Sequence, residues 1–334
     1  MALVTGARDL RALPKVHVHV HLDGSYPRDA VAALARRAGV PFQVPESFDT
    51  VWEFFDAYGT VPDLVADLDD LAELCRALVR AEAGAGVRYL EPAIEPQLYA
   101  PRLGDLETVT RTMLDALRSE ADARGIRVGA NLTVNTDQDE ELADALTDVA
   151  VRHASDGVTA FGTAGFEEPA GLHRFARHAR RATDAGLQVV AHAGQTGGPD
   201  SVREALDVLG ATRISHGVLA VGDPDLVARL AEERIVLDVC PVSNVALGVA
   251  ASLEEHPAVA LVEAGVPITL NADDALWFGR GVVDQYAIAR ERWGFDDARL
   301  AEIAGNGTLV GGMNDETRTL YERSLQAWFT AAPG

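Results

Sequence analysis

The sequence predicts an α/β fold, a (β/α)₈ TIM barrel with a helical insertion after its first strand and further helices at its C-terminus. Two observations predict this fold. Short runs rich in β-branched residues recur between longer helical stretches, and such alternation is typical of parallel βαβ units, eight of which close into a barrel. The length of 334 residues suits one barrel with an insertion, or two modest domains. The repeated units favour a single domain over residues 1–334.

The expected strands are residues 16–22, 87–96, 127–134, 158–163, 188–192, 213–218, 235–239 and 267–271. Several of the helical stretches between them end at a glycine just before the next strand, as expected of a C-cap: Gly86, Gly125, Gly186 and Gly265. A doubly wound open sheet is the structural alternative. The sequence HLDGSYPRD after the first strand contains no glycine-rich phosphate motif, which weakens that alternative.

The segment from about residue 26 to residue 86 is too long for a single crossover helix. It contains several helical pieces, including residues 29–38 and 64–81, and a group of aromatic residues between positions 48 and 58. We therefore predict a helical insertion over the mouth of the barrel, in which most of these aromatic side chains form local core. Residues 281–334 are predicted to form the closing helices.

Composition limits the partners. The formal net charge of −22 repels phosphate polyanions and anionic membranes, so we expect no nucleic-acid or membrane partner and a neutral or cationic small molecule as ligand. The two cysteines, Cys75 and Cys240, are far apart in sequence, which suits a reducing compartment. No window is apolar enough for a signal peptide or a membrane span. We expect a cytoplasmic enzyme of unspecified oligomeric state.

Unusual polar residues gather at the carboxyl ends of four expected strands. They are His19, His21 and Asp23 on the first, His192 and Gln195 on the fifth, His216 on the sixth, and Asp273 and Asp274 on the eighth. Barrel enzymes build their active sites from these strand ends. A lone histidine near a strand is usually structural, but four strand ends that each offer histidine or aspartate indicate a shared site.

The histidines of the first strand have the spacing of a metal chelate. His19 and His21 are two residues apart, so their side chains share one face, and His17 extends this alternation. With His192 and Asp273 they make three imidazoles and one carboxylate, a set that suits zinc or a similar divalent ion and leaves a position for water. Such a water loses a proton near neutral pH and becomes a nucleophile.

The neighbouring polar residues have a less defined role. His216 is either a further ligand or a residue that orients the hydroxide and stabilises developing charge. We prefer the second role, because the ligand set is already sufficient. Asp274 follows Asp273 directly and should face the substrate or support the ligands.

These motifs resemble the adenosine deaminase family, the adenosine/AMP deaminase-like branch of the amidohydrolase superfamily. The family pattern HxHLDG matches residues 19–24, and its HAGE motif is present in altered form as HAGQ at residues 192–195. Its histidine-glycine motif is found at residues 216–217, and its SLNTDD segment is similar to residues 269–274. The resemblance runs from residue 13 to about residue 306.

The resemblance implies hydrolytic deamination of adenosine or a related aminopurine nucleoside by a metal-bound hydroxide. It implies one zinc ion per chain, or another divalent transition metal, held by His19, His21, His192 and Asp273. It implies that His216 and Asp273 position and deprotonate the attacking water, and that residue 195 is catalytic. The implied substrate contacts are His21, Asp23, Gly24, Asp274 and a backbone amide near Gly165.

The main departure from the family is Gln195, where the family has a glutamate that protonates a ring nitrogen. An amide donates a hydrogen bond but cannot deliver a proton, and general acid catalysis is typically worth roughly 10²–10⁴-fold. Three explanations compete: an engineered substitution, a natural relative whose substrate needs no ring protonation, and a slow or inactive relative that only binds. Further departures at His17, Ser215 and Ala275 favour natural divergence.

The sequence therefore predicts a zinc-dependent aminohydrolase with Gln195 at the usual glutamate position. One alternative is a divergent amidohydrolase of specialised metabolism, in which Gln195 reads a group of a different substrate. The other is a catalytically impaired nucleoside-binding relative, and the intact ligand set argues against it.

Overall fold

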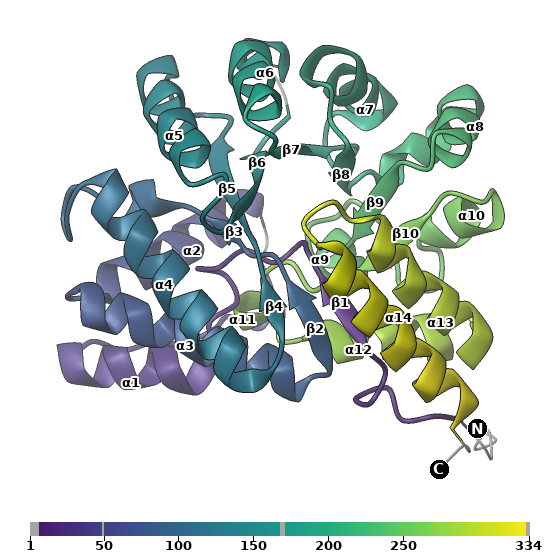
Figure 1. Cartoon of the computed structure of the whole chain (residues 1–334), viewed down its shortest axis with the longest axis horizontal. Coiled ribbons are helices and arrows are strands. Elements are labelled where there is room, and N and C mark those ends of the chain that lie inside the picture. The colour runs from purple at the N-terminus through teal and green to yellow at the C-terminus, as the bar shows by residue number, and fades with distance from the viewer. Residues whose placement is uncertain (1–6, 49, 168–170, 332–334) are drawn as a thin grey trace.

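Ten short strands, all paired in parallel, surround the centre of the computed structural model, which describes residues 7–48, 50–167 and 171–331 (Figure 1). The strands are β1 (Lys15–His17), β2 (Val87–Leu90), β3 (Ala93–Ile94), β4 (Arg127–Val128), β5 (Ala130–Asn135), β6 (Val158–Ala164), β7 (Gln188–Ala193), β8 (Arg213–His216), β9 (Val236–Val239) and β10 (Ile268–Leu270). They fall at the eight expected positions, with β2–β3 and β4–β5 each forming one interrupted barrel strand.

The strands close into a barrel through two sheets and two bridges. One sheet has the order β10-β9-β8-β7-β6-β5-β3 and the other β1-β2-β4. Beyond β1, Val20 bridges to Asp273 and His21 bridges to Ala93, so the first strand end joins both the last and the second. The predicted (β/α)₈ barrel is confirmed, and the two bridges lie where the predicted site residues are.

Most of the longer helices form a ring outside the strands (Figure 1). The helices are α1 (Arg28–Ala38), α2 (Val51–Leu64), α3 (Leu68–Gly84), α4 (Leu106–Arg124), α5 (Glu140–Arg152), α6 (Ala176–Asp184), α7 (Gly198–Glu204), α8 (Pro224–Glu232), α9 (Pro241–Ala246), α10 (Ala258–Glu263), α11 (Ala275–Phe278), α12 (Val282–Glu291), α13 (Asp297–Gly305) and α14 (Asp315–Thr330). Short 3₁₀ or π turns are η1 (Pro96–Leu98), η2 (His173–Phe175), η3 (Ala205–Leu209), η4 (Val218–Gly222) and η5 (Asn306–Leu309).

Local sequence explains where many helices begin and end. The side chains of Asp105 and Asp139 accept hydrogen bonds from backbone N–H groups in the first turns of α4 and α5, as N-caps do. Gly125 ends α4 with φ of 66°, in the left-handed region where glycine has no steric cost. The glycine signals in the sequence therefore mark real helix ends.

Three helices occupy the segment between β1 and β2, where the sequence predicts an insertion. Helix α3 packs along α4 in the outer ring, so α1 and α2 are the addition to a plain barrel. Phe54 and Tyr58 of α2 pack against each other, with ring centroids 5.9 Å apart, and Phe54 stacks on Phe278 of α11. This aromatic contact fixes α2 against the carboxyl end of the barrel.

A buried ion-pair network fills part of the barrel interior. Arg213 Nε lies 2.7 Å from Asp238 Oδ2, and the same guanidinium pairs with Glu91. Tyr89 and Thr159 donate hydrogen bonds to Glu91 at 2.9 and 2.8 Å. Because each charge is paired and hydrogen bonded, burial is tolerated.

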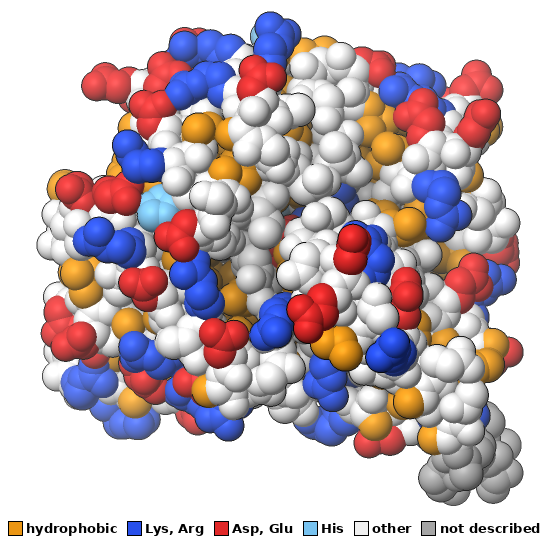
Figure 2. Space-filling model, in the orientation of Figure 1, with side chains coloured by type: hydrophobic (Ala, Val, Ile, Leu, Met, Phe, Trp, Pro, Cys, Tyr) orange, Lys and Arg blue, Asp and Glu red, His pale blue; other side chains and the backbone are white. Residues whose placement is uncertain are grey.

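The surface carries mixed charges. Figure 2 shows acidic and basic side chains interspersed over the outer helices on the face it presents. Within the described residues, no helix has both the length and the apolar character needed to cross a bilayer.

Candidate metal centre and active site

A cavity of about 390 Å³ lies at the carboxyl ends of the strands, between the barrel and α2. Seven of the ten predicted site residues line it: His21, Gly165, His192, Gln195, His216, Asp273 and Asp274. Of the other three, His19 lies against Asp273 and Gly24 against Asp274, while Asp23 is bonded to Tyr26 and Tyr99, which are not among the lining residues.

The four predicted metal ligands converge. His19, His21, His192 and Asp273 each offer an atom within 4.8 Å of the others, and all four are buried. Asp273 Oδ1 lies 3.2 Å from His19 Nε2 and 3.3 Å from His21 Nε2, and His21 Nε2 lies 3.2 Å from His192 Nε2. The sequence brings these groups together from the first, fifth and eighth barrel strands.

Two of the imidazoles are oriented by backbone carbonyls. His19 Nδ1 lies 3.0 Å from the carbonyl of Asp238, and His192 Nδ1 lies 2.6 Å from that of Thr163. A carbonyl only accepts, so Nδ1 carries the proton on each ring and the Nε2 lone pair faces the cluster. His19 Nε2 is buried without a hydrogen-bond partner. Lone pairs facing one another around a carboxylate oxygen need a cation between them, so these residues fit a divalent metal.

Electrostatics in the cluster support the same conclusion. Burial lowers the pKa of His21, but the carboxylates of Asp274 and Asp273 outweigh that effect and raise it to about 10. Burial, together with His19 and His21, holds the pKa of His192 well below its usual range, so that ring is neutral and able to ligate. The cluster therefore favours a positive charge among its side chains, and the ring of His192 stays neutral.

A second group of four could also hold an ion. It combines His19 and Asp273 with His216 and Cys240. Burial raises the pKa of the Cys240 thiol well above its usual range, and a protonated thiol is a poor metal ligand. The set of three histidines and Asp273 is the better donor set.

The backbone is strained at two of these positions. His216 has φ of 67° and Asp273 has φ of 60°, in the left-handed region that side chains with a Cβ rarely adopt. The surrounding structure must hold both residues in place, and such strain concentrates at functional sites. The turn at Asp273 also brings Asp274 to the cavity.

Asp274 and Gly24 are packed together. A Cβ on Gly24 would lie 1.7 Å from Asp274 Oδ1 and 2.9 Å from Tyr58 Cε2, so this position must be glycine for Asp274 to keep its place. Asp274 Oδ1 is buried and has no hydrogen-bond partner. Asp23 accepts hydrogen bonds from Tyr99 and, at 3.4 Å, from Tyr26, and burial raises its pKa to about 7.

The loop that carries Gln195 is held by a residue that sequence reasoning did not single out. The Glu167 carboxylate accepts hydrogen bonds from the backbone N–H groups of Gly194, Gln195, Thr196 and Gly197 at 2.7–3.0 Å, and from the Ser201 hydroxyl. This carboxylate joins the loop after β6 to the loop after β7. The backbone that carries Gln195 is therefore held by the loop of the neighbouring strand β6.

Replacing Glu167 with glutamine should loosen this loop. One carboxylate oxygen becomes an amide NH₂ that cannot accept, and each buried donor left unpaired costs roughly 1–3 kcal/mol. We expect kcat/KM to fall about 10–100-fold with metal content retained, and amide hydrogen exchange at residues 194–197 to accelerate. The matched control is Glu204→Gln, which alters a carboxylate that accepts the N–H groups of Leu172 and His173. Unchanged exchange at residues 194–197 in Glu167→Gln would contradict this role.

Glu95 is a second residue that sequence reasoning missed. It lines the cavity at the end of the second barrel strand, is 3% exposed, and accepts hydrogen bonds from Tyr58 Oη at 3.2 Å and from the Asn135 amide. Burial raises its pKa. Glu95 precedes Pro96 at the end of the expected strand 87–96, so the rule that barrel active sites lie at the carboxyl ends of strands applies to it as well.

His17 does not join the cluster, although its spacing would place it on the same face. Its Nδ1 lies 2.8 Å from Glu82 Oε2 on α3, and its Nε2 accepts from the backbone N–H of Ala272 at 3.1 Å. Regular β1 ends at His17, so the alternation of side chains is not maintained to His19. His17 ties the first strand to α3 and to the last barrel strand.

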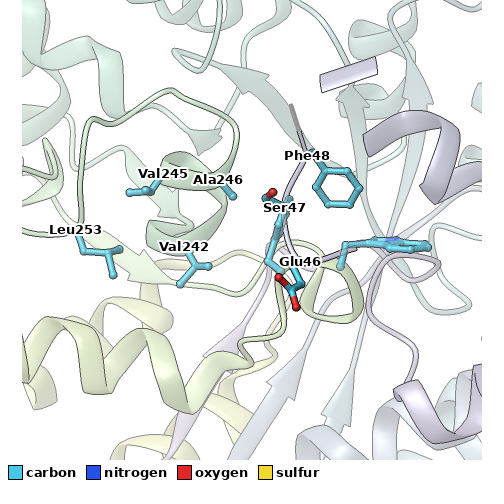
Figure 3. A pocket seen from close by; sticks show the side chains of 9 residues that line it. Glu46, Ser47, Phe48, Val242, Val245, Ala246 and Leu253 are labelled. Atoms are coloured by element: carbon cyan, nitrogen blue, oxygen red, sulfur yellow. The ribbon is translucent and has the colours of Figure 1, made fainter. Parts of the chain in front are cut away.

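A second cavity, of about 320 Å³, lies beside α9 (Figure 3). Its walls are mostly apolar, with Phe48 on one side and Val242, Val245 and Leu253 on the other. None of the predicted site residues lines it. The chemistry therefore belongs to the cavity with the histidine cluster.

Comparisons with known proteins agree with this site. A family model described as adenosine deaminase matches residues 14–323. The chain is similar to a putative adenosine/adenine deaminase of Streptomyces virginiae, 35% identical over 335 residues that cover 97% of this chain and 99% of that protein. The solved adenine deaminase of Arthrobacter aurescens has a TM-score of 0.88 at 28% identity, covering 96% of this chain and all of that one.

A further similar structure was solved with zinc bound. An amidohydrolase from Burkholderia ambifaria with bound zinc has a TM-score of 0.86 at 26% identity, covering 96% of this chain and 91% of that one. The matches extend over nearly the whole chain and agree on one kind of protein. The chain belongs to the adenosine deaminase family and is a deaminase-type hydrolase of the amidohydrolase superfamily.

Proposed function

We propose that this protein is a zinc-dependent aminohydrolase that deaminates adenosine, adenine or a related aminopurine. The observation that carries the proposal is the convergence of His19, His21, His192 and Asp273, whose buried ligand atoms lie within 4.8 Å of one another. The zinc in the similar structure from Burkholderia ambifaria supports this choice of metal. Zinc bound there would lower the pKa of a water ligand and so supply a nucleophile near neutral pH.

The remaining residues of the cavity would bind and orient the ring. Asp274 has a free carboxylate oxygen beside the cluster and can accept a hydrogen bond from a ring N–H or amino group. Gly165, with φ of 86°, lines the cavity, and its backbone could contact the substrate because no side chain covers it. Gln195 would contact a ring nitrogen by a hydrogen bond without delivering a proton.

The experiment that tests the proposal joins metal analysis to an ammonia-release screen. The screen compares the protein with its Gln195→Glu variant on adenine, adenosine, other aminopurines, pterins and cytosine derivatives. Stoichiometric zinc and ammonia release from an aminopurine by either protein would support the proposal. Absence of ammonia release from every aminopurine by both proteins would overturn it.

The charge of the cavity predicts that phosphorylated nucleotides are rejected. Glu95, Asp137, Asp273 and Asp274 line it, and no described lining residue is lysine or arginine. A phosphate would find no cationic side chain to pair with in the described lining, and the exposed carboxylate of Asp137 at the rim would repel it. We expect kcat/KM for AMP to be about tenfold or more below that for the better of adenine and adenosine, the effect of roughly 1.4 kcal/mol.

Ammonia release measured on the three substrates at several salt concentrations checks this prediction. Salt should raise the rate with AMP relative to the others, because it screens the repulsion. Asp137 is exposed at the rim, and Asp137→Asn should raise the AMP rate while leaving the neutral substrates unchanged. Comparable kcat/KM values for AMP and adenosine would contradict the prediction.

A further inference from the structure

Behind His216, away from the cavity, two buried side chains form a chain of hydrogen bonds. His216 Nδ1 lies 3.1 Å from Asn244 Nδ2, and Asn244 Oδ1 lies 3.2 Å from His256 Nε2. His256 Nδ1 in turn accepts a hydrogen bond of 3.1 Å from the backbone N–H of Ala258. All three side chains are at most 2% exposed, so water does not compete for these bonds.

The backbone N–H at the far end fixes the direction of every bond in the chain. An N–H only donates, so His256 Nδ1 is the unprotonated nitrogen and Nε2 carries the proton. Burial lowers the pKa of His256 to about 4, which keeps this ring neutral. His256 Nε2–H therefore donates to Asn244 Oδ1. A reversed amide would place its NH₂ against this N–H, two donors facing each other.

With its amide oriented in this way, Asn244 donates to His216. Asn244 Nδ2 carries the hydrogens, so His216 Nδ1 accepts and the proton of the neutral ring lies on Nε2. His216 Nε2 is the atom that faces the cluster, 3.8 Å from Asp273 Oδ2. His19 and His192 have the opposite arrangement, since carbonyls hold their protons on Nδ1 and leave Nε2 free.

We propose that Asn244 and His256 are positioning residues that hold His216 in its Nε2–H form, which makes it a hydrogen-bond donor to the reacting groups and excludes it as a metal ligand. The cluster then contains two kinds of histidine, distinguished by the group that is hydrogen bonded to Nδ1 of each ring. Carbonyls make His19 and His192 ligands, and an amide NH₂ makes His216 a donor. A donor at this place stabilises negative charge that develops on an oxygen during hydrolysis.

The role of His216 in hydrolysis rests on the proposed function, but the tautomer of its ring can be measured without turnover. Nuclear magnetic resonance of zinc-loaded protein labelled with ¹⁵N-histidine distinguishes the two ring forms, and the nine histidines are assigned by single substitutions. We expect the Nε2–H form for His216 in the unmodified protein. The Nδ1–H form there would overturn the proposal whether or not the protein releases ammonia.

The decisive variant is Asn244→Asp. A carboxylate only accepts, so Nδ1 of His216 must carry a proton, and the neutral ring then presents the lone pair of Nε2 to the cluster, while His256 keeps its donor role. We expect the ¹⁵N signature of His216 to switch, kcat to fall at least ~10-fold and KM to stay within about threefold, because a wrong tautomer affects the chemical step. An unchanged tautomer in this variant would overturn the proposal.

A second variant covers the case in which Asn244→Asp does not fold. His256→Phe keeps a ring against Trp293, whose centroid lies 5.5 Å away, and removes the donor to Asn244 Oδ1. The amide can then take both orientations, so His216 should show a mixture of ring forms and a lower kcat. The matched control, His178→Phe, removes another buried histidine, bonded to Asp144 on the outside of the barrel, and should leave His216 unchanged. A pure Nε2–H form in His256→Phe would overturn the role of His256.

Discussion

Replacing Asp273 with asparagine is expected to abolish metal binding and with it nearly all turnover. Asp273 Oδ1 lies within 3.3 Å of the Nε2 atoms of His19 and His21, and it is the carboxylate of the proposed ligand set. The amide removes the negative charge that offsets a divalent ion among buried imidazoles. A metal that activates water supplies several kcal/mol of transition-state stabilisation, so we expect kcat/KM to fall by roughly 10³-fold or more.

Two measurements check this result together. Metal content is determined by inductively coupled plasma mass spectrometry on protein freed of loosely bound ions, and ammonia release is measured on the best substrate. Thermal unfolding should show that added zinc stabilises the unmodified protein and not the variant, because only a folded site binds the ion. The matched control is Asp156→Asn, an exposed acid paired with Arg118, which should change none of the three.

An Asp273→Asn protein that keeps stoichiometric zinc and normal turnover would contradict the ligand assignment. The cavity would then need another carboxylate to take the place of Asp273, and Asp274 is the nearest along the chain. The double variant with both changes distinguishes these cases. If the double variant alone loses zinc, Asp274 replaces Asp273 as ligand.

Much of the fold and of the cluster could be predicted because the signals are local. Alternating β-branched runs and glycine caps determine where strands and helices lie, and the barrel rule places all strand ends on one face. The position of His19 and His21 at the end of the first expected strand therefore sufficed to place both beside His192 and Asp273. His17 shows the limit of this reasoning, since β1 ends there and the backbone beyond it is irregular.

The remaining residues act through contacts that no local pattern shows. Glu167 matters because four backbone donors of the next strand's loop and the Ser201 hydroxyl of α7 converge on it, and His256 because it lies two hydrogen bonds behind His216. Both depend on which strands become neighbours and how far their loops reach. Glu95 is different. It precedes Pro96 at the end of an expected strand, so a search for polar side chains at the carboxyl ends of the strands would have included it.

Replacing Gln195 with glutamate is expected to raise kcat on adenine or adenosine by roughly 10²–10⁴-fold, the usual worth of a general acid. The Gln195 side chain lines the cavity, and its backbone N–H donates to Glu167 at 2.8 Å, so the new carboxyl would start from a fixed loop. Glu95, Asp273 and Asp274 line the same cavity. Their negative charge disfavours a further carboxylate and keeps the new group protonated, which is the form that can donate a proton.

The pH dependence separates this explanation from a general improvement in folding or binding. A general acid is active only while it is protonated, so kcat of Gln195→Glu should fall as pH rises through the raised pKa of the new carboxyl group. The Gln195 protein should show no such fall in kcat at alkaline pH. Gln195→Met, which can neither donate nor protonate, should be slower than both. Gln326→Glu, an exposed change of the same kind on α14, should leave kcat unaltered.

The opposite result would identify a different substrate. If the Gln195 protein turns over some heterocycle and Gln195→Glu does not, the amide must form hydrogen bonds to a substrate group that a carboxylic acid cannot form. An amide offers both a donor and an acceptor at fixed positions, and a site built for such a pair rejects a mismatch strongly. The substrate would then carry a complementary acceptor and donor beside the reacting carbon and would need no protonation of the ring. In that case the proposed hydrolase activity and metal ligands would stand, and only the proposed aminopurine substrate would change.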